Sequence, residues 1–167
     1  MHVPDPRNVE ATDPAPIMRA LTIQADVTQV MTAWCDPKVQ RQLFAGAAEL
    51  VEVGSEASLW RLTAPLGRHP VVRLRTHAPS TMLVQQVLET DDGAQAAISL
   101  AVRPCAHRPG VEVELRVRYA PDGLAEGLLT RLLDPPPAAL AGQILRRLRA
   151  LLESGEIPSL TSNPAAR

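Results

Sequence analysis

Side chains that could support chemistry are sparse in this 167-residue sequence. The histidines show no metal-binding spacing such as HxxxH or HExxH; they are His2, His69, His77 and His107. Cys35 and Cys105 lie far apart and form no CxxC pair. Because a zinc site needs several such ligands brought together, we predict no metal and no cofactor. We expect both cysteines to be buried free thiols.

The most unusual polar pair is Gln85–Gln86, within "TMLVQQVLE" (residues 81–89). Side chains alternate between the two faces of a strand, so one of these amides points inward in either register. An inward amide costs a few kcal/mol unless it is hydrogen-bonded. One hypothesis is that it orients a ligand in an apolar pocket. The alternative is a glutamine near the rim of the sheet that reaches water or the backbone, and a bulge between the two could turn both outward.

The remaining polar candidates have simpler interpretations. Thr76 and Tyr119 are expected to point inward from two other strands, Thr76 chiefly as a β-former and Tyr119 at a strand end. Asp91 and Asp92 resemble a catalytic carboxylate pair, but the sequence "TDDG" around them is typical of a hairpin turn. The sequence contains no nucleophile elbow, phosphate-binding loop or GxGxxG motif.

Hydrophobic periodicity places these residues on secondary structure. "GVEVELRVRYAP" (residues 110–121) alternates apolar and charged residues as a strand with one buried face does. Similar patterns predict a first strand over residues 18–25 and six more between residues 47 and 120. Two short helices follow the first strand; Asp26 or Thr28 is available to cap the first, and Pro37 begins the second.

The C-terminal part of the chain has helical periodicity. Residues 122–133 form an apolar helical segment weakened by Gly123 and Gly127, and "DPPP" interrupts the chain after it. "AALAGQILRRLRALLESGE" (residues 138–156) predicts a long amphipathic helix, whose polar side includes Arg147. Only this helix is long enough to cover the apolar face of the sheet. We therefore predict an α+β fold, with a seven-stranded curved antiparallel sheet around a long C-terminal helix.

This order of elements resembles the START-like helix-grip superfamily, also called SRPBCC, and in particular its polyketide cyclase/dehydrase-like branch. The resemblance covers about residues 18–158. It rests on "IQADVTQVMTAWCDP", "LWRLTAPLGR" and "ILRRLRALLESGEIP", which mark the fold and are not catalytic signatures. It implies a cavity between sheet and C-terminal helix that holds an apolar molecule such as a lipid or polyketide. Some members of the superfamily are aromatase/cyclases.

We expect one START-like helix-grip domain over residues 17–158, with a disordered N-terminal tail (1–16) and a flexible C-terminal tail (159–167). Residues 122–133 are expected to act as a lid on the cavity. The residues expected to line the cavity are those predicted to point inward: Trp60, Leu62, Leu74, Thr76, Gln85, Gln86, Ile98, Leu100, Val113, Leu115, Tyr119, Leu128, Leu132, Ile144 and Leu148.

Three function classes follow. The first is binding of a small apolar ligand. The second is a polyketide aromatase/cyclase or dehydratase, which would need polar groups for proton transfer; the inward positions offer none with a charge, although an inward Arg68 or His69 would favour it. The third is a protein-interaction module without a ligand.

Composition excludes some other partners. A net charge of -1 gives no reason to expect nucleic acid, and the outward Arg61, Arg73 and Arg75 are interpreted as a solvated face. No segment approaches the roughly 18 apolar residues of a membrane span, and the N-terminus has no apolar signal core. We therefore expect a cytoplasmic protein.

Overall fold

The computed structural model describes residues 15–63, 69–77, 79–91, 93, 95–119 and 137–157, with Tyr119 described by its backbone alone. The described strands are β1 (Ile17–Ile23), β2 (Ala48–Val53), β3 (Ala57–Leu62), β4 (Val71–Thr76), β5 (Leu83–Thr90), β6 (Gln95–Pro104) and β7 (Val111–Tyr119). The described helices are α1 (Val27–Cys35), α2 (Pro37–Leu43) and α4 (Pro137–Ser154). The predicted tails and the predicted lid over 122–133 fall almost entirely outside the described residues.

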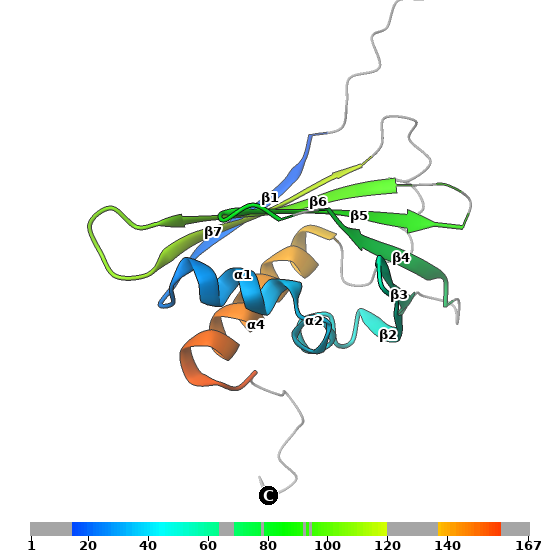
Figure 1. The fold of residues 1–167 in the computed structure, drawn as a ribbon, viewed down its shortest axis with the longest axis horizontal. Coiled ribbons are helices and arrows are strands. Elements are labelled where there is room, and N and C mark those ends of the chain that lie inside the picture. The colour runs from blue at the N-terminus through cyan, green and yellow to red at the C-terminus, as the bar shows by residue number, and fades with distance from the viewer. Residues whose placement is uncertain are drawn as a thin grey trace, which may run out of the picture.

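The strands form one antiparallel sheet in the order β1-β7-β6-β5-β4-β3-β2. Figure 1 shows this sheet as one layer with α1, α2 and α4 together on one side of it, while β2 and β3 bend toward the helices. The α+β class, the seven-stranded curved sheet, the helix pair after β1 and the C-terminal helix are all confirmed. The face toward the helices is called the inner face below, and the opposite face the outer face.

Alternation along the strands assigns side chains to these faces as predicted. In β7, Val111, Val113 and Leu115 are buried while Glu112 is exposed. In β6, Ala96, Leu100 and Val102 are buried. The register shifts in β2, between Leu50 and Glu52. This irregularity lies at the edge strand, so it leaves the inward set of the central strands unchanged.

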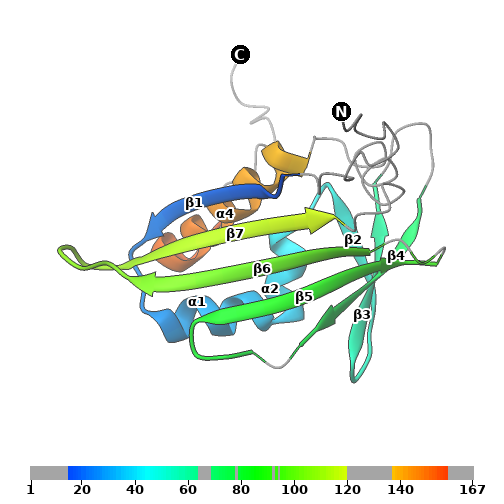
Figure 2. The ribbon, with the colours of Figure 1, turned by 90° about the horizontal axis from the view of Figure 1, so that it is seen from above.

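The cover of the inner face is shared between helices, which corrects the expectation that the C-terminal helix alone supplies it. α4 packs along β1, α1 packs against β6, and α2 contacts both β2 and α4. In Figure 2, which looks onto the outer face, α4 lies behind β1 and β7 while α1 lies behind β5 and β6. The two short helices can do this because α1 buries one stripe containing Val30, Ala33 and Trp34.

Capping side chains fix where the two short helices begin. The Asp26 carboxylate accepts a hydrogen bond from the backbone N–H of Gln29 at 2.8 Å, and the Gln29 side chain accepts one from the N–H of Asp26 at 2.9 Å. This reciprocal pair is a capping box. Asp36 caps α2 by accepting from the N–H of Lys38 at 2.8 Å, with Pro37 in the first turn. Of the two predicted caps of α1, the structure therefore selects Asp26.

Replacing the capping residue should destabilise the protein measurably. We expect Asp26→Ala to lower the free energy of unfolding by about 1 kcal/mol, because the N–H of Gln29 loses its acceptor. Thr28→Ala, which removes the rejected candidate, should change it by less than about 0.5 kcal/mol. Urea denaturation monitored by circular dichroism measures both, and equal effects of the two substitutions would contradict the assignment.

Candidate functional site

The buried residues separate into two clusters along the inner face. The larger cluster fills the space between α1, α4 and the strands β1, β5, β6 and β7, and it includes Val30, Leu100, Val113, Leu145 and Leu148. The smaller cluster lies toward the other end of the sheet and is built on Trp60, Leu62, Val72, Leu74 and Ala96. Trp34, Leu115, Ala141 and Ile144 of the larger cluster and all five of these residues of the smaller one border the same open space, which therefore lies between the two clusters.

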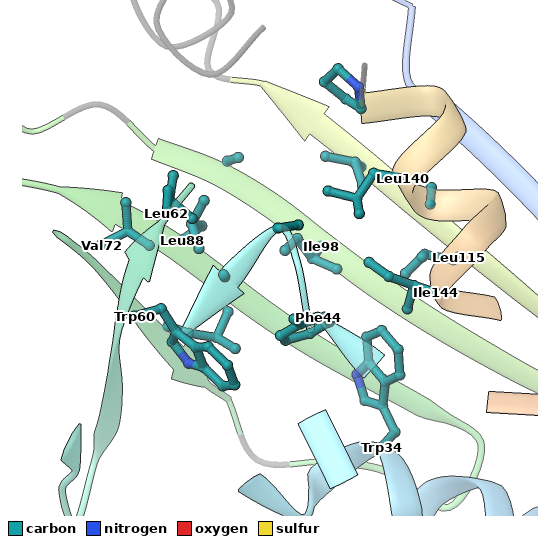
Figure 3. A pocket seen from close by; sticks show the side chains of 17 residues that line it. Trp34, Phe44, Trp60, Leu62, Val72, Leu88, Ile98, Leu115, Leu140 and Ile144 are labelled. Carbon is teal, nitrogen blue, oxygen red and sulfur yellow. The ribbon is translucent and has the colours of Figure 1, made fainter. Parts of the chain in front are cut away.

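This cavity has a volume of about 130 Å³ and is bordered by β3, β4, β6, β7 and the first turns of α4. Figure 3 shows Trp60, Leu62 and Val72 on one side of it and Leu140 and Ile144 of α4 on the other. Its described lining is apolar and comprises Trp34, Phe44, Ala47, Ala48, Trp60, Leu62, Val72, Leu74, Leu88, Ala96, Ile98, Leu115, Val117, Pro137, Leu140, Ala141 and Ile144.

Three aromatic rings form one wall of the cavity. The Trp34 and Phe44 ring centroids are 6.3 Å apart with an interplanar angle of 82°. The Phe44 and Trp60 centroids are 5.1 Å apart at 68°. Both are edge-to-face contacts, the arrangement that the ring quadrupole favours. The rings come from α1, the end of α2 and β3, so this contact fixes the helix pair against the curled end of the sheet.

The polar atoms of this wall are already used by neighbouring side chains. The indole N–H of Trp34 donates to Oε1 of Gln86 at 3.0 Å, and Nε2 of Gln86 donates to Oγ1 of Thr76 at 3.0 Å. The indole N–H of Trp60 donates to Oγ of Ser58 at 2.8 Å. Because each indole N–H has a partner, neither tryptophan offers a donor to the cavity, and its described surface is hydrocarbon.

This network answers the question raised by Gln85 and Gln86. Gln86 points inward and is 1% exposed, whereas Gln85 is exposed on the outer face. The amide of Gln86 is hydrogen-bonded to Trp34 and Thr76, and Gln86 is not among the residues that line the cavity. Both hypotheses for an inward glutamine are therefore replaced by a third, in which the amide satisfies a buried indole.

Arg147 holds α4 against the helix pair. Its Nη1 donates to the carbonyl oxygens of Leu43 at 2.8 Å and of Ala45 at 2.7 Å. Leu43 is the last residue of α2 and Ala45 lies just beyond the helix, where carbonyl groups lack intrahelical donors. Helical periodicity placed Arg147 on the polar side of α4 but did not predict this contact. Its guanidinium caps the C-terminal end of α2, next to Phe44 in the cavity wall.

The structure brings six of the fifteen expected lining residues to the cavity; they are Trp60, Leu62, Leu74, Ile98, Leu115 and Ile144. Leu100, Val113 and Leu148 point inward as expected but pack into the larger cluster, because α1 and α4 together fill that end. Thr76 and Gln85 are exposed. The side chain of Tyr119, and all of Leu128 and Leu132, lie outside the described residues.

Sequence reasoning missed other lining residues, chiefly Trp34, Phe44, Ala47 and Ala48. Trp34 lies on the apolar stripe of α1, so its burial could be predicted, but the position of α1 beneath β6 could not. Ala47 and Ala48 are small residues that follow the aromatic Phe44. Small side chains close to a large one are only a weak indication that a cavity lies beside them.

Titratable groups are absent from the described lining of the cavity. No group of three or more His, Cys, Asp or Glu residues in the described ranges could hold a metal ion. Cys35 and Cys105 are free and half-buried rather than fully buried. Burial raises the pKa of the Cys35 thiol, which keeps it protonated and unreactive near neutral pH.

Comparisons with known proteins bear on the fold. No family model and no curated protein matches the sequence. A solved structure from Deinococcus radiodurans is similar over 85% of this chain and 100% of that chain, with a TM-score of 0.64 and 17% identity. A protein from Chromobacterium violaceum matches 84% of this chain and 99% of its own, at TM-score 0.61 and 17% identity.

A third structure, from Rhodobacter sphaeroides, matches 84% of this chain and 93% of its own, at TM-score 0.60 and 20% identity. At these identities the likeness shows the shared fold and nothing about activity. Within the part of the chain that the structure describes, no helix is long and apolar enough to cross a membrane.

The bond between Trp34 and Gln86 yields a stability prediction. We expect Gln86→Leu to lower the free energy of unfolding by about 1–3 kcal/mol, because it leaves the buried indole N–H of Trp34 without an acceptor. Gln85→Leu, the same change on the outer face, should shift it by less than about 0.5 kcal/mol. Guanidinium unfolding curves compare the two variants, and a neutral Gln86→Leu would refute the structural role of this amide.

Proposed function

We propose that the protein binds a small apolar molecule in the cavity between the sheet and α4. The observation that supports this most directly is a cavity of about 130 Å³ whose described lining contains apolar side chains alone. Empty space of this kind forfeits dispersion contacts, so a ligand that fills it gains them. The resemblance to the START-like superfamily implies a ligand in the same place.

The size of the cavity narrows the class of ligand. Apolar cavities of roughly 150 Å³ stay dry and bind benzene or xenon. Pockets for drug-sized molecules are larger, at roughly 300–1,000 Å³. A cavity of about 130 Å³ therefore suits a molecule or moiety with the bulk of one aromatic ring or a short hydrocarbon. A complete lipid or polyketide would have to extend beyond the space bordered by these residues.

The chemistry of the lining favours binding over catalysis. Cyclisation or dehydration requires groups that transfer protons, and the described lining carries no titratable side chain. His69, whose inward position would have favoured an enzyme, is exposed, and Arg68 lies outside the described residues. We accordingly propose a binding protein, acting in the cytoplasm, without a catalytic step of its own.

Filling the cavity should abolish binding. Ala96 lines the cavity from β6, and its chain neighbour Ala97 is exposed on the outer face of the same strand. We expect Ala96→Leu to eliminate binding of toluene, measured by calorimetric titration, and to raise the free energy of unfolding by about 1 kcal/mol through cavity filling. Ala97→Leu should leave toluene binding unchanged.

Fluorescence provides a second readout, since the two tryptophans of the chain both line the cavity. Toluene should shift the tryptophan emission of the wild-type protein and of Ala97→Leu, but not that of Ala96→Leu. The proposed site would be refuted if the wild-type protein bound neither toluene nor other single-ring hydrocarbons. It would also be refuted if the Ala96→Leu variant bound them as tightly as the wild-type protein does.

A further inference from the structure

A second hollow lies on the outer face of the sheet, away from the apolar cavity. It has a volume of about 420 Å³ and is formed by β5, β6 and β7 together with His77. Figure 2 looks onto this face of the three strands. Unlike the apolar cavity, this hollow is bordered by side chains that can donate hydrogen bonds: His77, Gln85, Ser99, Arg116 and Arg118.

Side-chain size and strand register explain why the outer face is hollow here. Ser99 pairs with Gln85 on one side and with Arg116 on the other. Ala97 lies two residues before Ser99, on the same face of β6, and pairs with Val87 and Arg118. Directly opposed residues have Cβ atoms roughly 5 Å apart. The short side chains of β6 therefore form a floor between longer side chains on both neighbouring strands.

The hollow has an excess of positive charge. Arg118 is exposed and makes no hydrogen bond or ion pair with the described residues. Nη2 of Arg116 donates to Oε1 of Glu114 at 2.9 Å and contacts Sδ of Met18 at 3.3 Å. No carboxylate belongs to the described lining itself. The guanidinium of Arg118 is thus available to an external anion.

Arg116 also carries an unused donor. Its Nε is buried and has no hydrogen-bond partner in the described part of the protein. A buried donor without an acceptor is uncommon and costs about 1–3 kcal/mol. An oxyanion that draws this half-exposed side chain toward the hollow would supply the acceptor. The guanidinium group of an arginine presents parallel N–H donors, and their spacing matches that of two oxygens of a phosphate or carboxylate.

We propose that this outer hollow binds a small free organic anion through its phosphate or carboxylate head. Arg118 supplies the charge, Arg116 a second guanidinium, and Gln85 and Ser99 neutral donors. Nucleic acid fits less well because the described aromatic side chains, those of Trp34, Phe44 and Trp60, all lie on the inner side, where no base can stack on them.

Two anionic probes test the proposal on the full chain: inorganic phosphate and citrate. We expect saturable shifts of the Nε–H resonances of Arg116 and Arg118 in nitrogen-15 NMR spectra, which weaken as sodium chloride is added. Arg118→Gln should reduce the affinity about tenfold by removing a charge-assisted contact. Arg73→Gln is the matched control, because Arg73 is exposed on the same face, outside the hollow.

The alanine pair separates this site from the apolar cavity. Ala97→Leu should weaken anion binding by occupying the floor of the hollow, while Ala96→Leu should leave it intact, the reverse of their effects on toluene. The proposal is overturned if neither anion gives saturable shifts, or if Arg118→Gln and Arg73→Gln weaken binding equally. It is also overturned if a single-stranded oligonucleotide binds the hollow in preference to both anions.

Discussion

The structure depends on covering the inner face of one strongly curved sheet with short helices and a single longer one. A seven-stranded sheet presents more apolar surface than α4 can cover alone, because α4 follows the edge strand β1. α1 covers the centre, and the two helices together pack the sheet tightly at that end. Toward β3 and β4 the rings of Trp34 and Phe44 reach the Trp60 ring of β3, and the cavity lies beside these three rings.

Polar groups near this space are arranged so that none of the described ones enters it. Gln86 and Ser58 accept from the two indole N–H groups, which keeps the tryptophans oriented while their carbon surface faces the cavity. A buried amide must keep the orientation in which its hydrogen bonds form, whereas a leucine side chain has no such directional requirement. The wall of the cavity is therefore ordered by hydrogen bonds behind it, and its inner surface remains hydrocarbon.

The fold could be predicted from the sequence, because hydrophobic periodicity indicates where the strands and helices lie. Alternation in β6 and β7, the stripe along α4 and the Asp-Gly turn each point to one local structure, and together they allow few topologies. The cavity was predicted less well. Leu100 and Val113 share the inward alternation of Leu115 and Ile98, and Leu148 lies on the same buried side of α4 as Ile144. The position of α1, together with that of α4, decides which of them is packed and which borders open space. That position depends on long-range contacts such as Trp34 with Gln86, which no local pattern contains.

The pairing of β1 with β7 has a kinetic consequence. Ile17 lies opposite Val117, so the first described strand forms its ladder with the last. During synthesis β1 has no neighbour until about a hundred residues more have left the ribosome, and the contact that closes the sheet has a large sequence separation. Folds of such high contact order assemble slowly. A ribosome-bound chain that ends before β7 would expose the unpaired backbone and apolar side chains of β1, which are features that chaperones and aggregation both act on.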